Sequence, residues 1–164
     1  MVNDVSLSGD DARYLRRAIE LSAIGRDRGN RPFGAVIVLA DGEVAAEAWA
    51  NSGETGDCTG HAETHAIRLA SPKYSREVLA GATIYSSAEP CVMCAGAIFW
   101  SNIRRLVFGI DAIALRDFRG ERGDQKDVEL SCRDVLEASP HAVAVIGPVL
   151  GDEAAVPHAG VWKT

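Results

Sequence analysis

Apolar and polar residues follow two different periods along the chain, and the switch between them predicts alternating helices and strands. From Ala12 to Ala23, apolar residues recur three to four apart, which places them on one face of a helix, and Gly29 ends the run. Nearly continuous apolar runs predict buried strands instead. The pattern predicts helices at about 10–28, 61–70, 91–102 and 131–138, and strands at 33–40, 44–50, 82–87, 105–110 and 142–146.

The order of these elements predicts an α/β fold. Asp41-Gly42 is a strong tight-turn signal, so the first two strands are expected to form an antiparallel hairpin. The later strands are separated by helices, which favours mixed strand directions with helices on both faces of the sheet. We therefore expect a three-layer α/β/α sandwich around a five-stranded mixed sheet, in one domain over 1–164. The segment 111–130 is charged, contains glycine and predicts no clear element.

Composition and charge narrow the classes of function. Hydrophobic residues make up 47% of the 164 residues, yet no apolar run approaches the length of a membrane span, so no membrane partner is expected. The first residues show no basic region followed by an apolar one, which predicts a cytoplasmic protein without a signal peptide. The net charge of -6, from 17 Lys and Arg against 23 Asp and Glu, argues against a nucleic-acid partner.

A strand-to-helix corner at 88–100 carries the first chemical signal. Cys91 and Cys94 are three apart, so a helix that begins there, with Pro90 in its first turn, projects both sulfurs from one face. The partial positive charge of a helix N-terminus lowers the pKa of thiols placed there. Two such thiolates are half of a tetrahedral zinc site, but the same pair is also typical of a redox Cys-x-x-Cys motif. A third ligand is needed to decide between metal and disulfide chemistry.

A second predicted helix start offers that third ligand. His61 opens the helix at 61–70, after a polar, glycine-rich loop at 51–60. One histidine and two cysteines leave the fourth zinc position open for water, as a catalytic zinc requires. Glu63 would lie beside that water. A thioredoxin-like redox protein, the alternative interpretation of the cysteine pair, has no use for His61 or Glu63.

The remaining cysteines and histidines have no clear motif around them. Cys58 and Cys132 are expected to be small buried hydrophobic residues rather than ligands. His65 lies one helical turn after the first histidine, but a zincin places its glutamate directly after that histidine. We therefore expect His65 to be packed, or to lie behind the metal ligands, and not to bind the metal. His141 and His158 are expected to be exposed.

The His-Ala-Glu of 61–63, followed by the Pro-Cys-Val-Met-Cys of 90–94, resembles the paired signature of the cytidine deaminase-like superfamily of zinc deaminases. The likeness extends over about 32–109 and is less clear beyond. It implies the fold of that superfamily, one Zn²⁺ per chain held by the histidine and the two cysteines, and a homodimer. It also implies that Glu63 is the general acid and base that moves a proton from water to the substrate.

The resemblance further implies where a substrate ring would lie. Asn51 matches an asparagine that hydrogen-bonds the substrate in related base deaminases, while Phe33 and Ala62 match positions along the flat faces of the ring. Trp100 is similar to the tryptophan of a Tyr-Trp pair in bacterial guanine deaminases. Two further predicted contacts are Asp111, just after the strand at 105–110, and Trp162, in the tail. The predicted substrate contacts are thus Asn51, Phe33, Ala62, Trp100, Asp111 and Trp162.

The predicted reaction is the hydrolytic deamination of a free nucleobase or related amino-heterocycle with a guanine-, isoguanine- or cytosine-like ring, which yields a carbonyl and ammonia. A tRNA-specific adenosine deaminase is the alternative, because the run at 89–97 also matches those enzymes. Against it stand the acidic balance, the lack of a basic carboxyl-terminal helix, and Trp100 where those enzymes tend to carry histidine. A zinc-bound scaffold without catalysis is a further alternative, although all four site residues are present.

Overall fold

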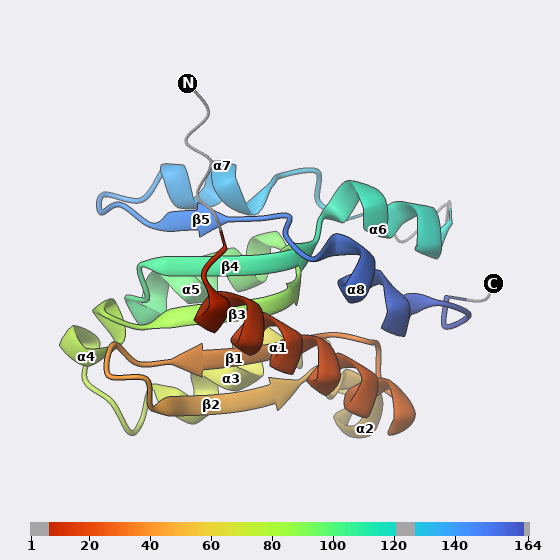
Figure 1. The fold of residues 1–164 in the computed structure, drawn as a ribbon, viewed down its shortest axis with the longest axis horizontal. Helices are drawn as coiled ribbons and strands as arrows, with labels where there is room; N and C mark the ends of the chain where they lie inside the picture. The colour runs from red at the N-terminus through yellow and green to blue at the C-terminus, as the bar shows by residue number, and fades with distance from the viewer. Residues whose placement is uncertain (1–6, 121–126, 163–164) are drawn as a thin grey trace.

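A five-stranded mixed sheet runs through the middle of the molecule (Figure 1). The computed structural model describes residues 7–120 and 127–162. The strand order is β2-β1-β3-β4-β5, in which β1 is antiparallel to β2 and β3, whereas β3, β4 and β5 are parallel. The strands are β1 (Gly34–Val38), β2 (Val44–Trp49), β3 (Thr83–Ala88), β4 (Arg105–Ile110) and β5 (Ala144–Ile146). The predicted five-stranded mixed sheet is confirmed.

Helices cover both faces of this sheet, which confirms the predicted three layers. On one face lie α1 (Gly9–Asp27) and α8 (Gly151–Ala155), and on the other lie α3 (Ala62–Ala70) and α5 (Val92–Ser101) (Figure 1). The helix α7 (Cys132–Glu137) packs against α5. Among the helices of the described residues, none is both long enough and apolar enough to cross a bilayer.

The predicted helices and strands are all present, and their ends lie within two residues of the predicted ones. Pro90 was expected in the first turn of α5 but precedes the residue that caps this helix, Cys91. In the part of the chain that the structure describes, five short helices of three to eight residues were not predicted, because one or two turns leave little periodic signal. They are α2 (Ser52–Thr55), α4 (Arg76–Ala80), α6 (Ala112–Arg119), α8 and the 3₁₀ helix η1 (Val156–His158).

Small residues set how closely the helices approach the sheet. Ala62, Ala66 and Ala70 are spaced by four and fully buried, so they form the face of α3 that packs on the sheet. On the opposite face, a Cβ at Gly34 would lie 2.1 Å from the carbonyl oxygen of Ala18 in α1. Because only glycine fits there, α1 lies directly against β1.

A buried ion pair ties the start of α1 to the sheet. Asp11, 6% exposed, accepts hydrogen bonds of 2.7 and 2.8 Å from the guanidinium of Arg105 in β4, and one of 2.7 Å from the hydroxyl of Tyr85 in β3. The hydrogen bonds from Arg105 hold the pKa of Asp11 well below its usual range, with a smaller contribution from Tyr85. Asp11 therefore stays charged and anchors the helix.

Candidate metal centre and active site

Three side chains with metal-binding atoms meet at the starts of α3 and α5. His61 is the N-cap of α3 and Cys91 is the N-cap of α5, both with extended backbone, while the buried Cys94 lies one turn into α5. Their ligand atoms all lie within 4.8 Å of one another. The two helix starts are brought together because α3 and α5 pack side by side on one face of the sheet. The predicted convergence of the three side chains is therefore present.

The geometry of this group fits a zinc ion. The Nδ1 atom of His61 is 3.5 Å from the Sγ of Cys91 and 3.4 Å from the Sγ of Cys94. A tetrahedral zinc ion with ordinary bond lengths separates a nitrogen ligand from a sulfur ligand by about 3.5 Å. One imidazole and two thiolates also form a donor set that zinc prefers. His61, Cys91 and Cys94 are thus placed to hold a metal ion, and a redox role for the cysteine pair does not explain the histidine between them.

The electrostatics of the group favour a thiolate. A hydrogen bond from Cys94, aided by one from His61, lowers the pKa of Cys91 to about 4. The pKa of Cys94 is raised, because it shares a proton with Cys91 and is buried. The neighbouring thiolate of Cys91 also raises the pKa of His61. In the metal-free protein the two sulfurs therefore share one proton, which a binding zinc ion would displace.

Glu63 lies in the first turn of α3 beside the metal group. It is 5% exposed, and burial raises its pKa above the usual range of a carboxyl group. The hydroxyl oxygen of Ser86 is 2.8 Å from Glu63 Oε1 and 2.7 Å from the carbonyl oxygen of Ala88. Because a serine hydroxyl has one proton, it can donate to only one of these two oxygens at a time.

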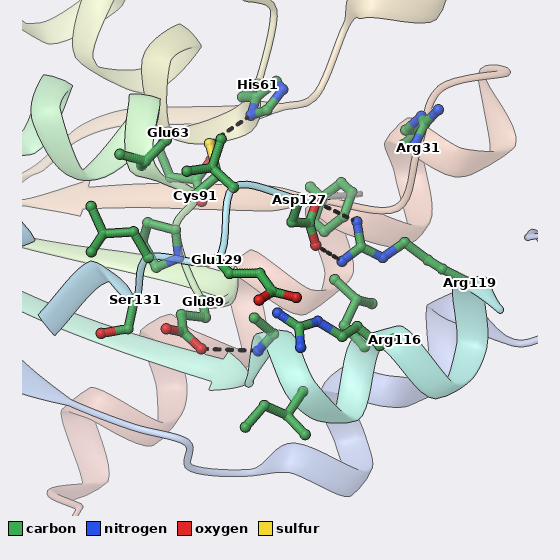
Figure 2. Close-up of a pocket in the computed structure, with 18 of the residues that line it drawn as sticks. Arg31, His61, Glu63, Glu89, Cys91, Arg116, Arg119, Asp127, Glu129 and Ser131 are labelled. Atoms are coloured by element: carbon green, nitrogen blue, oxygen red, sulfur yellow. Dashed lines mark hydrogen bonds and ion pairs between the residues drawn. The ribbon is translucent and has the colours of Figure 1, made fainter. Parts of the chain in front are cut away.

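A cavity of about 720 Å³ opens in front of these groups, at the carboxyl ends of the parallel strands β3 and β4. Figure 2 shows His61, Glu63 and Cys91 on one side of it and Arg116 and Arg119, from α6, across from them. We call the part formed by α6 and Trp162 the outer wall. Other residues that line the cavity include Phe33, Ser52, Glu89, Asp127, Glu129 and Ser131.

Glu89 joins the metal side of the cavity to the outer wall, and the sequence analysis did not identify it. Its Oε2 accepts a hydrogen bond of 2.9 Å from the backbone N–H of Ala112, at the start of α6 (Figure 2). Its own N–H donates to the carbonyl of Ile110, at 2.8 Å. The only sequence signal is a carboxylate two residues before Cys91, which by itself does not indicate a partner 23 residues later.

Two of the predicted substrate contacts line the cavity, namely Phe33 and Trp162. Ala62 is fully buried in the core under α3 and does not line it. Asn51 lies between two lining residues, Ala50 and Ser52, without lining the cavity itself. These positions are all near the metal group, but only the two aromatic side chains face the space in front of it.

The structure places the other two predicted contacts differently. The Oδ1 atom of Asp111 accepts a hydrogen bond of 2.6 Å from the backbone N–H of Ala114, so this side chain caps α6. Trp100 is 75% exposed at the end of α5 that lies away from Cys91. Neither side chain lines the cavity.

Three expectations about cysteine and histidine are wrong. Cys58 is exposed, because it lies in the polar loop at 51–60, on the surface. His158 is 1% exposed, because the chain folds back over the cavity edge and packs it against Phe33 and Phe118. His141 is half-buried against Phe99.

The other expectations about these residue types are confirmed. Cys132 is fully buried, and burial raises its pKa to about 12. His65 is half-buried and packed, with its Nδ1 3.1 Å from the carbonyl oxygen of Trp49. Because a carbonyl only accepts, Nδ1 of His65 carries a proton. Neither residue belongs to the metal group found among the described residues.

Comparison with known proteins gives the family. The cytidine and deoxycytidylate deaminase zinc-binding region matches residues 8–110, which include the metal group and Glu63. This match covers more than half of the chain, so the chain belongs to this family of zinc-binding deaminases.

Three similar proteins add detail. A protein of Schizosaccharomyces pombe named as a probable cytosine deaminase is 42% identical over 161 residues, which cover 98% of each chain. A variant of NE0047 in complex with 8-azaguanine has a TM-score of 0.76 and 26% identity, over 92% of this chain and 82% of that chain. A structure from studies of tRNA:A34 deaminases has a TM-score of 0.70 and 31% identity, over 89% of this chain and 99% of that chain.

Proposed function

We propose that this protein is a zinc-dependent hydrolytic deaminase of a free nucleobase or a closely related amino-heterocycle, with one Zn²⁺ per chain. The observation that carries the proposal is the convergence of three metal ligands and the buried Glu63 on one open cavity. The ligands are His61, Cys91 and Cys94. A bound zinc ion would supply a Lewis acid that lowers the pKa of water to about 7.

Glu63 is the proposed general acid and base. Burial raises its pKa, which favours the protonated form that a general acid needs to donate a proton. Water adds to the ring carbon that bears the amino group, and Glu63 transfers the proton of that water to the neighbouring ring nitrogen. Glu63 then moves the proton of the added hydroxyl group to the amino group, the C–N bond breaks, and the products are a ring carbonyl and ammonia.

The cavity favours a small flat substrate. Phe33 and Trp162 offer aromatic surfaces near the metal group, with ring centroids 6.0 Å apart and planes at 63°. A relative that matches 98% of the chain is named as a probable cytosine deaminase, and a structural neighbour is in complex with 8-azaguanine. Contacts from Asn51, Ala62 and Asp111 stay predictions, and a contact from Trp100 would require its exposed ring to reach the cavity.

A tRNA adenosine deaminase is the second candidate, because one structural neighbour comes from studies of tRNA:A34 deaminases and is covered almost completely. The net charge of -6 does not favour an RNA partner. The full-length similarity to a base deaminase also favours the first proposal.

The decisive experiment measures ammonia release by the zinc-loaded protein from cytosine, guanine, isoguanine, adenine and their nucleosides, beside inosine formation in an anticodon stem-loop. We expect turnover of at least one free base and none of the RNA. Glu63→Gln is the matched control, because it keeps the shape of the side chain and removes the carboxylate. Inosine in the RNA without turnover of any base would refute the first proposal and support the second.

The predicted homodimer is a further part of the proposal. It rests on the family resemblance, and the exposed Trp100 on α5 offers an apolar contact for a second copy. Size-exclusion chromatography with light scattering would measure the mass. A mass of one chain at micromolar concentration would contradict the homodimer.

A further inference from the structure

His158 is buried behind the cavity but contributes no atom to its surface. It is the last residue of η1, is 1% exposed, and does not line the cavity. Its ring packs edge-on against Phe33, with centroids 5.3 Å apart and planes at 69°, and near Phe118 at 6.1 Å. Both phenylalanines come from distant parts of the chain, so His158 lies inside an aromatic cluster that the fold assembles.

A hydrogen bond joins His158 to the outer wall. The indole Nε1–H of Trp162 donates to His158 Nδ1 at 3.1 Å. The two ring planes differ by 6° and the centroids are 6.0 Å apart, so the rings are nearly parallel. Because Nδ1 accepts, the proton of the neutral ring must be on Nε2. Burial, with the positive charge of Arg119 nearby, lowers the pKa of His158 to about 4, which keeps the ring neutral.

Packing alone does not explain a histidine at this position. Within the described part of the chain, the buried Nε2 of His158 has no hydrogen-bond partner. A buried donor without a partner is unfavourable, whereas a phenylalanine would fill the same aromatic surroundings without one. The feature that a phenylalanine lacks is the acceptor for Trp162.

Trp162 is held on its other sides by charged groups. The guanidinium of Arg31 lies 5.0 Å from the centroid of the indole ring, and that of Arg119 lies 5.8 Å from it. These two contacts restrain the faces of the indole ring. They do not hold its N–H edge. The hydrogen bond to His158 is the contact that fixes the edge of the indole.

We propose that His158 is a positioning residue that fixes the orientation of the Trp162 indole in the outer wall, and thereby the surface that the substrate ring meets. This inference rests on the proposed deaminase function, since it assigns the indole to substrate binding. His158 does not touch the reacting atoms. Its loss therefore affects substrate binding and leaves the metal chemistry intact.

The first test observes the ring pair directly by ¹⁵N NMR of the zinc-loaded protein. The chain has four histidines and three tryptophans, so Trp162→Phe assigns the indole signal. We expect His158 to carry its proton on Nε2, and His158→Phe to move the indole N–H signal of Trp162 upfield. His141→Phe is the matched control, because His141 also has a buried, unpartnered Nε2 but stacks on Phe99. A proton on Nδ1 of His158 would overturn the proposal.

The second test separates positioning from folding by kinetics with the preferred base. For His158→Phe we expect KM to rise about three- to ten-fold, the size of one lost hydrogen bond, with kcat within two-fold, zinc content unchanged and melting temperature unchanged or higher. Trp162→Phe should raise KM similarly, and the double variant should be no worse than the worse single variant. Three results would each refute the positioning role of His158. The first is a KM of the double variant that equals the product of the two single effects. The others are an unchanged KM in His158→Phe, and a KM that rises only together with a loss of stability.

The two tests also separate this inference from the proposed function. If no base is turned over, the deaminase proposal fails. The indole N–H signal of Trp162 then still tests whether Trp162 donates a hydrogen bond to His158. A signal that moves in His158→Phe but not in His141→Phe would still support the contact. A signal that moves in neither would overturn it whatever the activity.

Discussion

Two buried carboxylates in the first turns of two helices make an informative comparison. Asp11 in α1 and Glu63 in α3 are 6% and 5% exposed. The pKa of Asp11 is lowered by hydrogen bonds from Arg105, whereas burial raises the pKa of Glu63. Within the described residues, Asp11 has an ion pair and Glu63 has none.

The difference teaches that the partner, and not the depth of burial or the place in the helix, decides what a buried acid does. An acid with a guanidinium beside it stays charged and acts as an anchor. Among the described residues, the side-chain hydrogen-bond partner of Glu63 is the hydroxyl of Ser86. An acid without a cationic partner can change its protonation state, as proton transfer requires. The following variants test whether these two assignments can be separated.

The largest effect is expected from removing a metal ligand. This change should abolish the proposed deamination although Asp11 and Glu63 are both still present. Cys91→Ala should lose bound zinc, reduce activity to the detection limit, and lower the melting temperature, because the metal joins α3 to α5. Metal analysis and thermal unfolding measure these changes. Cys58→Ser is the control, since Cys58 is exposed and outside the metal group. Full zinc content in Cys91→Ala would contradict its role as a ligand.

Glu63→Gln should separate catalysis from stability. We expect kcat to fall about 10²- to 10⁴-fold, the usual contribution of a general acid and base. Zinc content and melting temperature should be unchanged, because the amide fills the same space and the ligands remain. Steady-state kinetics on zinc-loaded protein measures the effect. A variant as active as the parent protein would refute the assignment of Glu63.

Asp11→Asn should give the reverse result. We expect a loss of about 3 kcal/mol in the free energy of unfolding, the lower end for a broken buried pair, because the Arg105 side chain is 33% exposed. The kcat of the folded variant should stay within two-fold. Urea unfolding measures stability, and the exposed neighbour Asp10→Asn serves as control. A large fall in kcat at full stability would show that the two acids are not independent.

Ser86→Ala tests the contribution of the Ser86 hydroxyl, which lies 2.8 Å from Glu63 Oε1. We expect kcat to fall about ten-fold with little change in KM, because Glu63 loses the side-chain hydroxyl that lies within hydrogen-bond distance of its Oε1. Ser87→Ala is the matched control: its hydroxyl is also buried but accepts from the backbone N–H of Gly34. An equal fall in kcat for both variants would point to a general effect of cavities in β3.

The smallest effect concerns acid stability. The pKa of Asp11 is lower in the folded protein than the value of about 3.9 in the unfolded chain. Its ion pair therefore stabilises the fold above about pH 4 and loses this effect as the pH falls further. The stabilities of the parent protein and Asp11→Asn should approach each other steadily as the pH falls below 4 in urea unfolding. A constant difference over this range would contradict the lowered pKa.

The metal side of the cavity was predictable because its signals are local. His61 and Cys91 follow from helix starts and ligand spacing, and the structure has both as N-caps. The strands and longer helices were predictable for the same reason, since their periodicity extends over many residues.

The outer wall was not predictable because tertiary contacts define it. The start of α6 is capped by its own Asp111 and also by Glu89, which lies 23 residues before the group it binds. His158 is buried by residues far away in the sequence, among them Phe33 and Phe118. A single sequence contains no local signal for such pairs.

The two sides of the cavity come from parts of the chain that are far apart in the sequence, so the ribosome makes them at different times. The last metal ligand is Cys94, whereas Trp162 of the outer wall follows 68 residues later. During synthesis the nascent chain can therefore present the metal ligands long before the side chain that helps to close the cavity has been made. The last part of the substrate surface to be synthesised is therefore made after all three metal ligands.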